Sequence, residues 1–377
     1  MIIIGLGSVF IAAVVFQLIY LIFIYGRLAF FFRPGKKTVA DNEGLEAVTV
    51  IIAARNEKEN LKRLIPLLAA QDYPSFEIMI VNDRSQDGTK KLLENYMATY
   101  RNLRTVTITY LPGHVTAKKY AITLGIKVAK NDVILLTDAD CTPVSKDWIR
   151  LMTAPVRLQK KTFAVGYGAY KKLPGMLNKL IQFETLFTAL QYMSFGLWKA
   201  PYMAVGRNLS YRKSFFMEKN AFHGLWHIEG GDDDLFINKY ATGSNTSLVI
   251  DPESITISEP KTTYKDYNKQ KKRHFHAGKY YKTADKLKIG LFAFSHLLFW
   301  LSGTLLIIFS RDWRIALVVG ILMILRFLLV YRVFRGAKLN LEGKNKVWWT
   351  IFFDFMYLGY FWFMGTKGYL SKEVKWK

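Results

Sequence analysis

A long uncharged segment at the N-terminus constrains this chain more than any other feature of its sequence. Residues 2–25, IIIGLGSVFIAAVVFQLIYLIFIY, are apolar over a length sufficient to cross the hydrocarbon core of a bilayer as one helix. A secretory signal peptide is the alternative, but no basic region precedes the segment, the segment is too long, and no small-residue cleavage site follows it. We therefore expect residues 1–27 to form a transmembrane anchor and residues 28–46 to form a linker.

Basic residues after this segment predict its orientation. Arg27, Arg33, Lys36 and Lys37 follow the apolar run, and basic residues close to a membrane helix are retained on the cytoplasmic side. We expect the N-terminus to lie outside the cell, and the chain from residue 28 onward to lie at the cytoplasmic face of the inner membrane.

A second apolar region, residues 289–377, predicts further membrane helices. Residues 291–309 and 315–334 are separated by a short charged turn, which is typical of a helical hairpin. Residues 347–365 are ambiguous because Asp354 interrupts them and aromatic residues occur throughout, so this segment either spans the bilayer or lies in the interface. If it spans, a basic tail would face outside, against the charge rule: Lys367, Lys372, Lys375 and Lys377. The region therefore holds two or three helices, and its topology stays open.

The middle of the chain has the pattern of an α/β fold with a mostly parallel sheet. Apolar runs typical of strands covered on both faces alternate with helical periodicity. Parallel sheets of this kind bind ligands at the carboxyl ends of their strands. The expected strands are residues 47–54, 76–83, 105–111 and 132–140. The single cysteine, Cys141, allows no disulfide framework, which agrees with a cytoplasmic domain.

Three aspartates fall at the ends of these predicted strands. Asp138 and Asp140 are one residue apart after an apolar run, and Asp83 ends an earlier strand. Two carboxylates spaced in this way can share Mg²⁺ or Mn²⁺, which usually completes its shell with substrate phosphates. The alternative is a solvated turn that caps a helix. Neither the glycine-rich dinucleotide motif nor the P-loop motif follows a strand, so a metal and phosphate site is the stronger interpretation.

Seven motifs follow one another through the middle of the chain: VIIAARNE, VNDRSQDGT, TAKKYAITLGI, LLTDADCTP, VGRNLSYRKSFF, GGDDDLF and QKKRH. In order and in spacing they resemble the membrane-bound inverting glycosyltransferases of family 2, a group that includes cellulose, hyaluronan and poly-N-acetylglucosamine synthases. The resemblance covers residues 48 to about 280. It implies a glycosyltransferase-A type domain at residues 47–260, flanked by transmembrane helices.

The resemblance also implies roles in binding the donor and a metal. Asp83 would accept hydrogen bonds from a uracil, and Lys118 would lie near the donor. Asp138 and Asp140 would form the metal-binding pair, with Asp140 the more direct ligand of Mg²⁺ or Mn²⁺. Three more residues would line the nucleoside pocket after the first strand: Ala53, Arg55 and Glu57.

Further residues are implied in catalysis and acceptor binding. Asp232 would be the catalytic base, and Gln270 with Arg273 would contact the donor diphosphate and the acceptor. Two positions depart from the family pattern. His274 stands where processive synthases have tryptophan, which removes a stacking surface for a growing chain, and Gly231 stands where many members have glutamate. We therefore do not expect processive synthesis of a long chain.

The chemistry of glycosyl transfer fits these residues independently. A bound cation neutralises a leaving diphosphate, and a carboxylate takes the proton from the acceptor hydroxyl. With one base and no second carboxylate as nucleophile, direct displacement with inversion is the simplest course. We expect transfer from a nucleoside diphosphate sugar, with a UDP-sugar favoured, to a lipid-linked or saccharide acceptor. Two alternatives remain, namely a helix-capping role for residues 232–234 and a membrane-anchored protein that binds nucleotide sugars without turnover.

The segment of residues 261–288 is rich in lysine and aromatic residues, and the whole chain carries a net charge of +24. Attraction to anionic lipid headgroups explains most of these lysines. The planar guanidinium of Arg273 is the exception, since it suits a diphosphate. Nucleic-acid binding is the rival interpretation. Membrane segments at both ends argue against a nucleic-acid partner.

Overall fold

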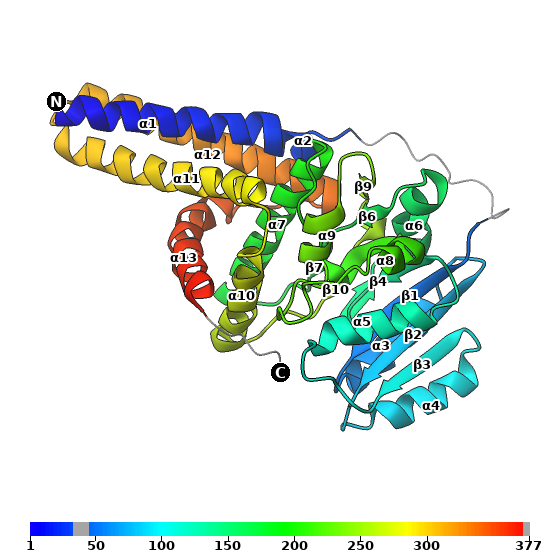
Figure 1. Ribbon diagram of the computed structural model, residues 1–377. Coiled ribbons are helices and arrows are strands. Elements are labelled where there is room, and N and C mark those ends of the chain that lie inside the picture. Colours follow the sequence, from blue (N-terminus) through cyan, green and yellow to red (C-terminus); the bar gives the residue numbers. More distant parts are fainter. Residues whose placement is uncertain (33–44, 372–377) are drawn as a thin grey trace.

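The computed structural model describes residues 1–32 and 45–371, which form a bundle of long helices next to an α/β domain (Figure 1). The residues on which part of the topology prediction rests, Arg33, Lys36 and Lys37 after the anchor and Lys372, Lys375 and Lys377 in the tail, lie outside this description.

The α/β domain is built on a sheet of seven strands, and its parallel part agrees with the sequence prediction. The strand order is β3-β2-β1-β4-β8-β6-β9. The first four strands are mutually parallel, whereas β8 runs antiparallel to both of its neighbours. The strands are β1 (Val48–Ala54), β2 (Phe76–Asp83), β3 (Leu103–Ile108), β4 (Val133–Leu136), β6 (Phe163–Val165), β8 (Leu209–Arg212) and β9 (Thr246–Leu248).

Helices cover both faces of this sheet, which explains why its strands are continuously apolar. Ile51 of β1 packs with α5 (Ala117–Val128) on one face, whereas Val50 and Ile52 pack with α3 (Lys58–Ala69) and α6 (Trp148–Leu158) on the other. Gly125 lets α5 approach closely, because a Cβ there would lie 2.9 Å from methyl groups of Ile51 and Val81.

A second sheet of three short strands lies beside the first. Its order is β5-β10-β7, with β5 (Cys141–Pro143), β7 (Gly168–Tyr170) and β10 (Thr256–Ser258). Because β4 ends at Leu136 and β5 begins at Cys141, residues 137–140 form the junction between the two sheets. The remaining elements of the domain are α4 (Thr89–Thr99), α7 (Met176–Leu197), η2 (Gly206–Asn208), α8 (Lys213–Glu218), α9 (Asp234–Tyr240) and η3 (Pro252–Ser254).

Three helices within the described residues are long and apolar enough to cross a membrane: Ile2–Ala29, Thr283–Phe309 and Trp313–Glu342. The first comprises α1 (Ile2–Ile19), a π-helical turn η1 (Tyr20–Tyr25) and α2 (Gly26–Ala29). The other two are α11 (Thr283–Phe309) and α12 (Trp313–Glu342), and the three lie side by side in Figure 1. The predicted helical hairpin is present, and each of its helices is longer than its apolar run.

The ambiguous third segment forms α13 (Thr350–Leu370), which is not among these three candidate spans. It packs against α10 (Tyr264–Gly278), the helix formed by the basic segment, and it lies below the bundle on the side of α10 that faces away from the sheet (Figure 1). Tyr267 stacks on Tyr360, and Phe275 meets Phe361 edge to face. The C-terminal region of the described chain therefore holds two candidate spans, and α13 also contacts α7 of the α/β domain.

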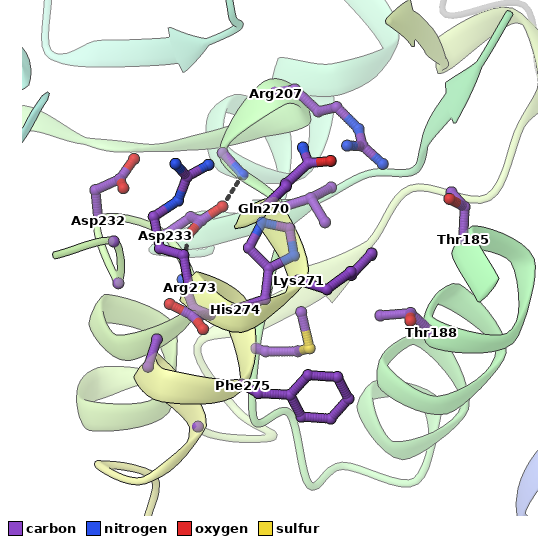
Figure 2. Close-up of a pocket in the computed structure, with 18 of the residues that line it drawn as sticks. Thr185, Thr188, Arg207, Asp232, Asp233, Gln270, Lys271, Arg273, His274 and Phe275 are labelled. Atoms are coloured by element: carbon purple, nitrogen blue, oxygen red, sulfur yellow. Dashed lines mark hydrogen bonds between the residues drawn. The ribbon is translucent and has the colours of Figure 1, made fainter. Parts of the chain in front are cut away.

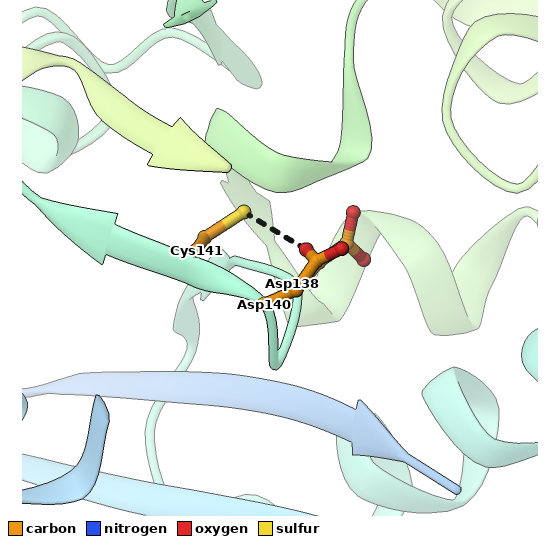
Figure 3. A group of neighbouring side chains, drawn as sticks. All are labelled: Asp138, Asp140 and Cys141. Carbon is orange, nitrogen blue, oxygen red and sulfur yellow. Dashed lines mark hydrogen bonds between the residues drawn. The ribbon is translucent and has the colours of Figure 1, made fainter. Parts of the chain in front are cut away.

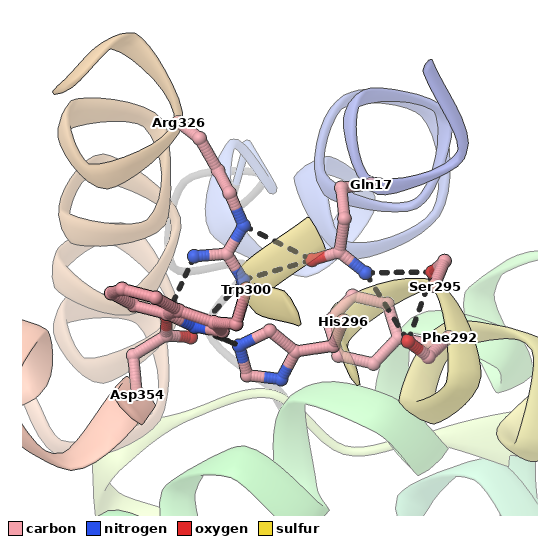
Figure 4. Close-up of polar contacts among 7 residues, drawn as sticks. All are labelled: Gln17, Phe292, Ser295, His296, Trp300, Arg326 and Asp354. Carbon is pink, nitrogen blue, oxygen red and sulfur yellow. Dashed lines mark hydrogen bonds and ion pairs between the residues drawn. The ribbon is translucent and has the colours of Figure 1, made fainter. Parts of the chain in front are cut away.

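A buried ion pair holds α13 to the bundle (Figure 4). Arg326 of α12 donates to both carboxylate oxygens of Asp354, over 2.6 and 3.2 Å, and also donates to Gln17 of α1. His296 of α11 lies 3.3 Å from the same carboxylate. Asp354, which interrupts the apolar run, therefore ties α13 to α12 and α11, and Arg326 extends the contact to α1.

We predict that Arg326→Leu destabilises the protein by about 3–5 kcal/mol, because it leaves Asp354 charged and buried without its cation. The thermal unfolding midpoint in detergent measures this change. The double variant Arg326→Leu with Asp354→Leu should recover most of the loss, and Arg332→Leu, at an exposed site on the same helix, should change little. Equal midpoints for the single and the double variant would contradict a pairing role.

Candidate active site

The two aspartates of the D-x-D motif lie in the turn that joins the two sheets (Figure 3). Single ligand atoms of Asp138, Asp140 and Cys141 all lie within 4.8 Å of one another. The Cys141 thiol is buried beside Ser258 Oγ at 2.9 Å, and burial keeps its pKa well above the usual value. Because hard divalent cations prefer oxygen ligands, the two carboxylates fit Mg²⁺ or Mn²⁺ and the protonated thiol does not.

The electrostatics of Asp140 also fit a cation. Burial raises the pKa of its carboxyl to about 6, and the negative charges of Asp138 and Glu57 add to the effect. A divalent ion between these groups would relieve the repulsion. The ionised carboxylate of Asp140 would therefore be stabilised by a positively charged partner.

Lys118 links this turn to the predicted base. Its ammonium lies 3.0 Å from Asp138 Oδ1 and 3.1 Å from Asp232 Oδ2. Lys118 sits in the first turn of α5, where the helix dipole disfavours a cation. The two carboxylates compensate, because they outweigh burial and hold the pKa of Lys118 well above its usual value.

Asp232 is the carboxylate of the GGDDDLF loop that faces Lys118. Its side chain is only 6% exposed. Burial would raise its pKa, but Lys118 and Lys119 outweigh burial and lower it, so the group is ionised at neutral pH. Lys119 itself donates to the carbonyl oxygens of Ile228 and Gly230, which fixes the chain just before this loop.

The other two aspartates of the loop hold its backbone. Asp233 accepts from the backbone N–H groups of Gly206 and Asp234. Asp234 accepts from the Leu235 N–H and from the Tyr281 hydroxyl. Asp233 and Asp234 therefore have the capping role that was the alternative for all three aspartates. Asp232 instead faces the ammonium of Lys118.

Gly231, one of the departures from the family pattern, has a physical reason in this loop. Its φ is +73°, and a Cβ there would lie 2.3 Å from the Leu235 side chain. The backbone before Asp232 is thus shaped for glycine, and a glutamate at this position would require a different loop.

The predicted Q-x-x-R residues approach the same site from α10. Gln270, Arg273 and His274 all line a cavity of about 1090 Å³ that also contains Asp138, Asp140 and Asp232. Figure 2 shows this helix between the aspartate loop on one side and α7 on the other. His274 lines this cavity, and its side chain is exposed within it.

Only three of the four residues predicted to bind the nucleoside line the cavity. Ala53, Arg55 and Glu57 line the cavity next to the D-x-D turn. Asp83 is not among the residues described as lining the cavity. It is 2% exposed, and its carboxylate accepts two hydrogen bonds from Arg84, at 2.7 and 3.1 Å. The role of Asp83 with uracil stays a prediction, and it requires Arg84 to move or to share the carboxylate.

Sequence reasoning missed Arg207 of η2, although it lies within the quoted motif VGRNLSYRKSFF. Its guanidinium donates to Gly168 O at 2.6 Å and to the Tyr170 hydroxyl at 3.1 Å, and it lines the cavity. Gln270 donates to the same hydroxyl at 3.2 Å. Tyr170 thus connects η2 with α10, a contact that no spacing in the sequence indicates.

Comparisons with known proteins give the family and the fold of the domain that holds these residues. Residues 49–218 match the family model described as Glycosyl transferase family 2, so the chain contains a glycosyltransferase family 2 domain. It is 27% identical over 242 residues to the probable glycosyltransferase YdaM of Bacillus subtilis, a match that covers 63% of this chain and 56% of that protein. It is 31% identical over 134 residues to 4,4'-diaponeurosporenoate glycosyltransferase of Staphylococcus aureus, over 36% of this chain and 34% of that protein. These matches thus span about half or less of the relatives.

A solved structure shares the whole architecture. The mannosyltransferase PcManGT from Pyrobaculum calidifontis, solved in complex with GDP-Man and Mn²⁺, superposes with a TM-score of 0.62 over 98% of this chain and 100% of that one, at 17% identity. At this identity the likeness concerns the fold, which is a glycosyltransferase-A-like fold with flanking apolar helices.

We predict that Mn²⁺ affinity falls as the pH drops through about 6. Asp140 must lose its proton to bind a cation, and its raised pKa means that protons compete below that value. The loss should reach about tenfold per pH unit below the pKa. Calorimetric titration of Mn²⁺ about one unit above and one unit below pH 6 measures it. Asp140→Asn should bind weakly at both values, and unchanged affinity of the native protein across this range would contradict the assignment.

Proposed function

We propose that the protein is an inverting glycosyltransferase that moves a sugar from a nucleoside diphosphate donor to a lipid-linked or saccharide acceptor at the cytoplasmic face of the membrane. The observation that carries the proposal is the double ion pair of Lys118 with Asp138 and Asp232. Through Lys118, the candidate metal ligand Asp138 and the candidate base Asp232 lie close together in the cavity of about 1090 Å³.

The reaction follows from these groups. The acceptor hydroxyl oxygen attacks the anomeric carbon, the bond from that carbon to the diphosphate oxygen breaks, and its electron pair leaves with the diphosphate. Asp232, ionised at neutral pH, takes the hydroxyl proton. A divalent cation held by Asp138 and Asp140 would neutralise the charge that develops on the diphosphate. Arg273 and Gln270 offer further hydrogen-bond donors to the leaving diphosphate.

The stereochemical outcome follows from the other two aspartates of the loop. A retaining enzyme needs a second carboxylate as nucleophile, by analogy with glycoside hydrolysis. Asp233 and Asp234 are occupied by backbone N–H groups and by Tyr281. A single displacement with inversion is therefore the course that this arrangement supports.

Asp232→Asn tests whether this residue is the base. The variant keeps the shape of the side chain, so nucleotide affinity should stay within a few-fold, whereas sugar transfer should fall about 10²- to 10⁴-fold. Transfer is measured with a radiolabelled donor, and nucleotide affinity by calorimetry. Asp72→Asn, at an exposed site away from the cavity, is the matched control. Transfer by Asp232→Asn within a few-fold of the native rate would move the role to Asp233 or Asp234.

Asp83→Asn should have the opposite effect, with donor affinity lowered before turnover. A protein that only binds nucleotide sugars would release no nucleotide in any of these variants, and Asp232→Asn and Asp72→Asn would leave its binding unchanged. The same set of variants therefore separates catalysis from binding.

The proposed membrane arrangement places residues 1–27 as an anchor, residues 47–260 as the catalytic domain, residues 261–288 at the interface and residues 289–377 in the membrane region. A tag at the N-terminus should then be accessible from outside intact cells, and a tag inserted near residue 160 only after the cells are opened. Residue 160 lies in the loop after α6, on the α/β domain. Accessibility of both tags from the same side would overturn this topology.

A further inference from the structure

The candidate active-site cavity extends well beyond the reactive groups, toward the membrane helices. At that end it is lined by Lys286, Ile289 and Gly290 of α11. These residues stand at positions i, i+3 and i+4, on one face of the helix. Because α11 is one of the helices apolar enough to cross a bilayer, the cavity reaches the start of a candidate membrane span.

The opposite wall of this extension comes from α13. Its lining residues form one stripe along the helix and are mostly aromatic: Tyr357, Phe361, Trp362, Gly365, Thr366 and Tyr369. Tyr369 and Leu370 at the end of α13 are 64% and 73% exposed. Aromatic side chains of this kind are enriched at the boundary between a bilayer and water. The wall is thus apolar along its length and open at its end.

Cations line the extension between this wall and the reactive groups. They are Lys269, Arg273, Lys279 and Lys286. Within the described residues, Lys279 and Lys286 donate to the backbone carbonyls of Ser371 and Lys279 and form no ion pair with a carboxylate. Lys271, by contrast, is neutralised by Glu184 of α7. The membrane end of the cavity therefore combines an apolar wall with two lysines, Lys279 and Lys286, that have no carboxylate partner in the part of the chain that the structure describes.

We propose that the acceptor is an anionic membrane lipid with a free hydroxyl in its headgroup, which reaches Asp232 from the bilayer between α11 and α13. This inference rests on the proposed glycosyl transfer. The apolar wall accommodates the lipid chain, and the four cations attract the phosphate of its headgroup. The attacking group is a hydroxyl and not the phosphate itself, because Asp232 has a use only where the acceptor oxygen carries a proton.

The covalent step is the one described above, with the lipid hydroxyl as nucleophile. Its oxygen forms the new bond to the anomeric carbon, Asp232 receives its proton, and the nucleoside diphosphate leaves with the electron pair. The product is a glycolipid that keeps its negative phosphate. It therefore partitions into organic solvent and binds to an anion exchanger.

Gly290→Trp tests the route without disturbing the fold. No atom lies within 4 Å of the position that a Cβ would take on Gly290, so a side chain can begin there without a clash, and the bulk of an indole should narrow the cavity at the membrane end. The same open space surrounds Gly359 of α13, which does not line the cavity and is exposed. Gly359→Trp is the matched control.

The experiment uses the full chain in vesicles of total polar lipids from a bacterial membrane, with a donor labelled in its sugar. Label should enter the organic phase and bind to the anion exchanger. Gly290→Trp should lower this transfer about tenfold or more. In detergent without lipid, the slow hydrolysis of the donor by water should stay within about twofold of the native rate. Gly359→Trp should match the native protein in both measurements.

A second pair of variants tests the charge. Lys286→Gln should raise the lipid concentration needed for half-maximal rate, with donor affinity unchanged, whereas Lys282→Gln, exposed and outside the lining of the cavity, should change neither. Two outcomes would overturn the inference. The label could appear only on soluble sugars, when these are supplied together with phosphatidylcholine vesicles, or it could appear on an uncharged lipid. Transfer to lipid by Gly290→Trp at the native rate would overturn the route. Failure of all forms to release nucleotide would instead refute the proposed glycosyl transfer.

Discussion

The ion pairs of Lys118 with Asp138 and Asp232 are the interaction on which the rest of the site depends. The first carboxylate belongs to a turn between two sheets, and the second belongs to a loop almost a hundred residues later in the chain. A partly buried cation at the start of α5 opposes the helix dipole and is stabilised because both carboxylates face it. The acidic loop in turn is held by Asp233 at Gly206, next to the strand that pairs with β4.

The helix α10 contacts both the reactive end of the cavity and α13. Its Gln270 and Arg273 line the reactive end of the cavity, while its aromatic residues Tyr267 and Phe275 pack on α13. The helix is therefore positioned from both sides. Because α13 is tied to the bundle through Asp354 and Arg326, the arrangement of the bundle is transmitted to the residues that would contact the diphosphate.

Much of the fold could be predicted from the sequence, because its signals are local. Apolar runs such as 48–54 and 76–83 predict buried parallel strands, and the alternation with helices leads to an α/β sheet whose carboxyl ends carry the aspartates. The D-x-D turn, Asp232, Gln270, Arg273 and His274 do converge on one cavity. Their individual roles stay predictions until variants are tested.

What the sequence did not predict depends on local backbone geometry and on contacts between distant segments. The hydrogen bonds from Arg84 to Asp83 follow from a local turn with positive φ at Arg84, which no composition rule identifies. The place of α13 beside α10 is decided by Asp354, and a single acid in an apolar run is compatible with both a spanning and an interfacial helix. The joint contact of Arg207 and Gln270 with Tyr170 likewise requires the two sheets to be in place.

The central claim, a cation-dependent glycosyl transfer at Asp138, Asp140 and Asp232, is tested most directly by nucleotide release from a panel of UDP- and GDP-sugars. The purified protein is mixed with each donor in the presence of bacterial lipid vesicles, once with Mn²⁺ and once with a chelator. We predict that one donor, or a small group of related donors, releases its nucleotide with Mn²⁺ and that the chelator abolishes this release. Release at the same rate in chelator, or from none of the donors with Mn²⁺ present, would contradict it.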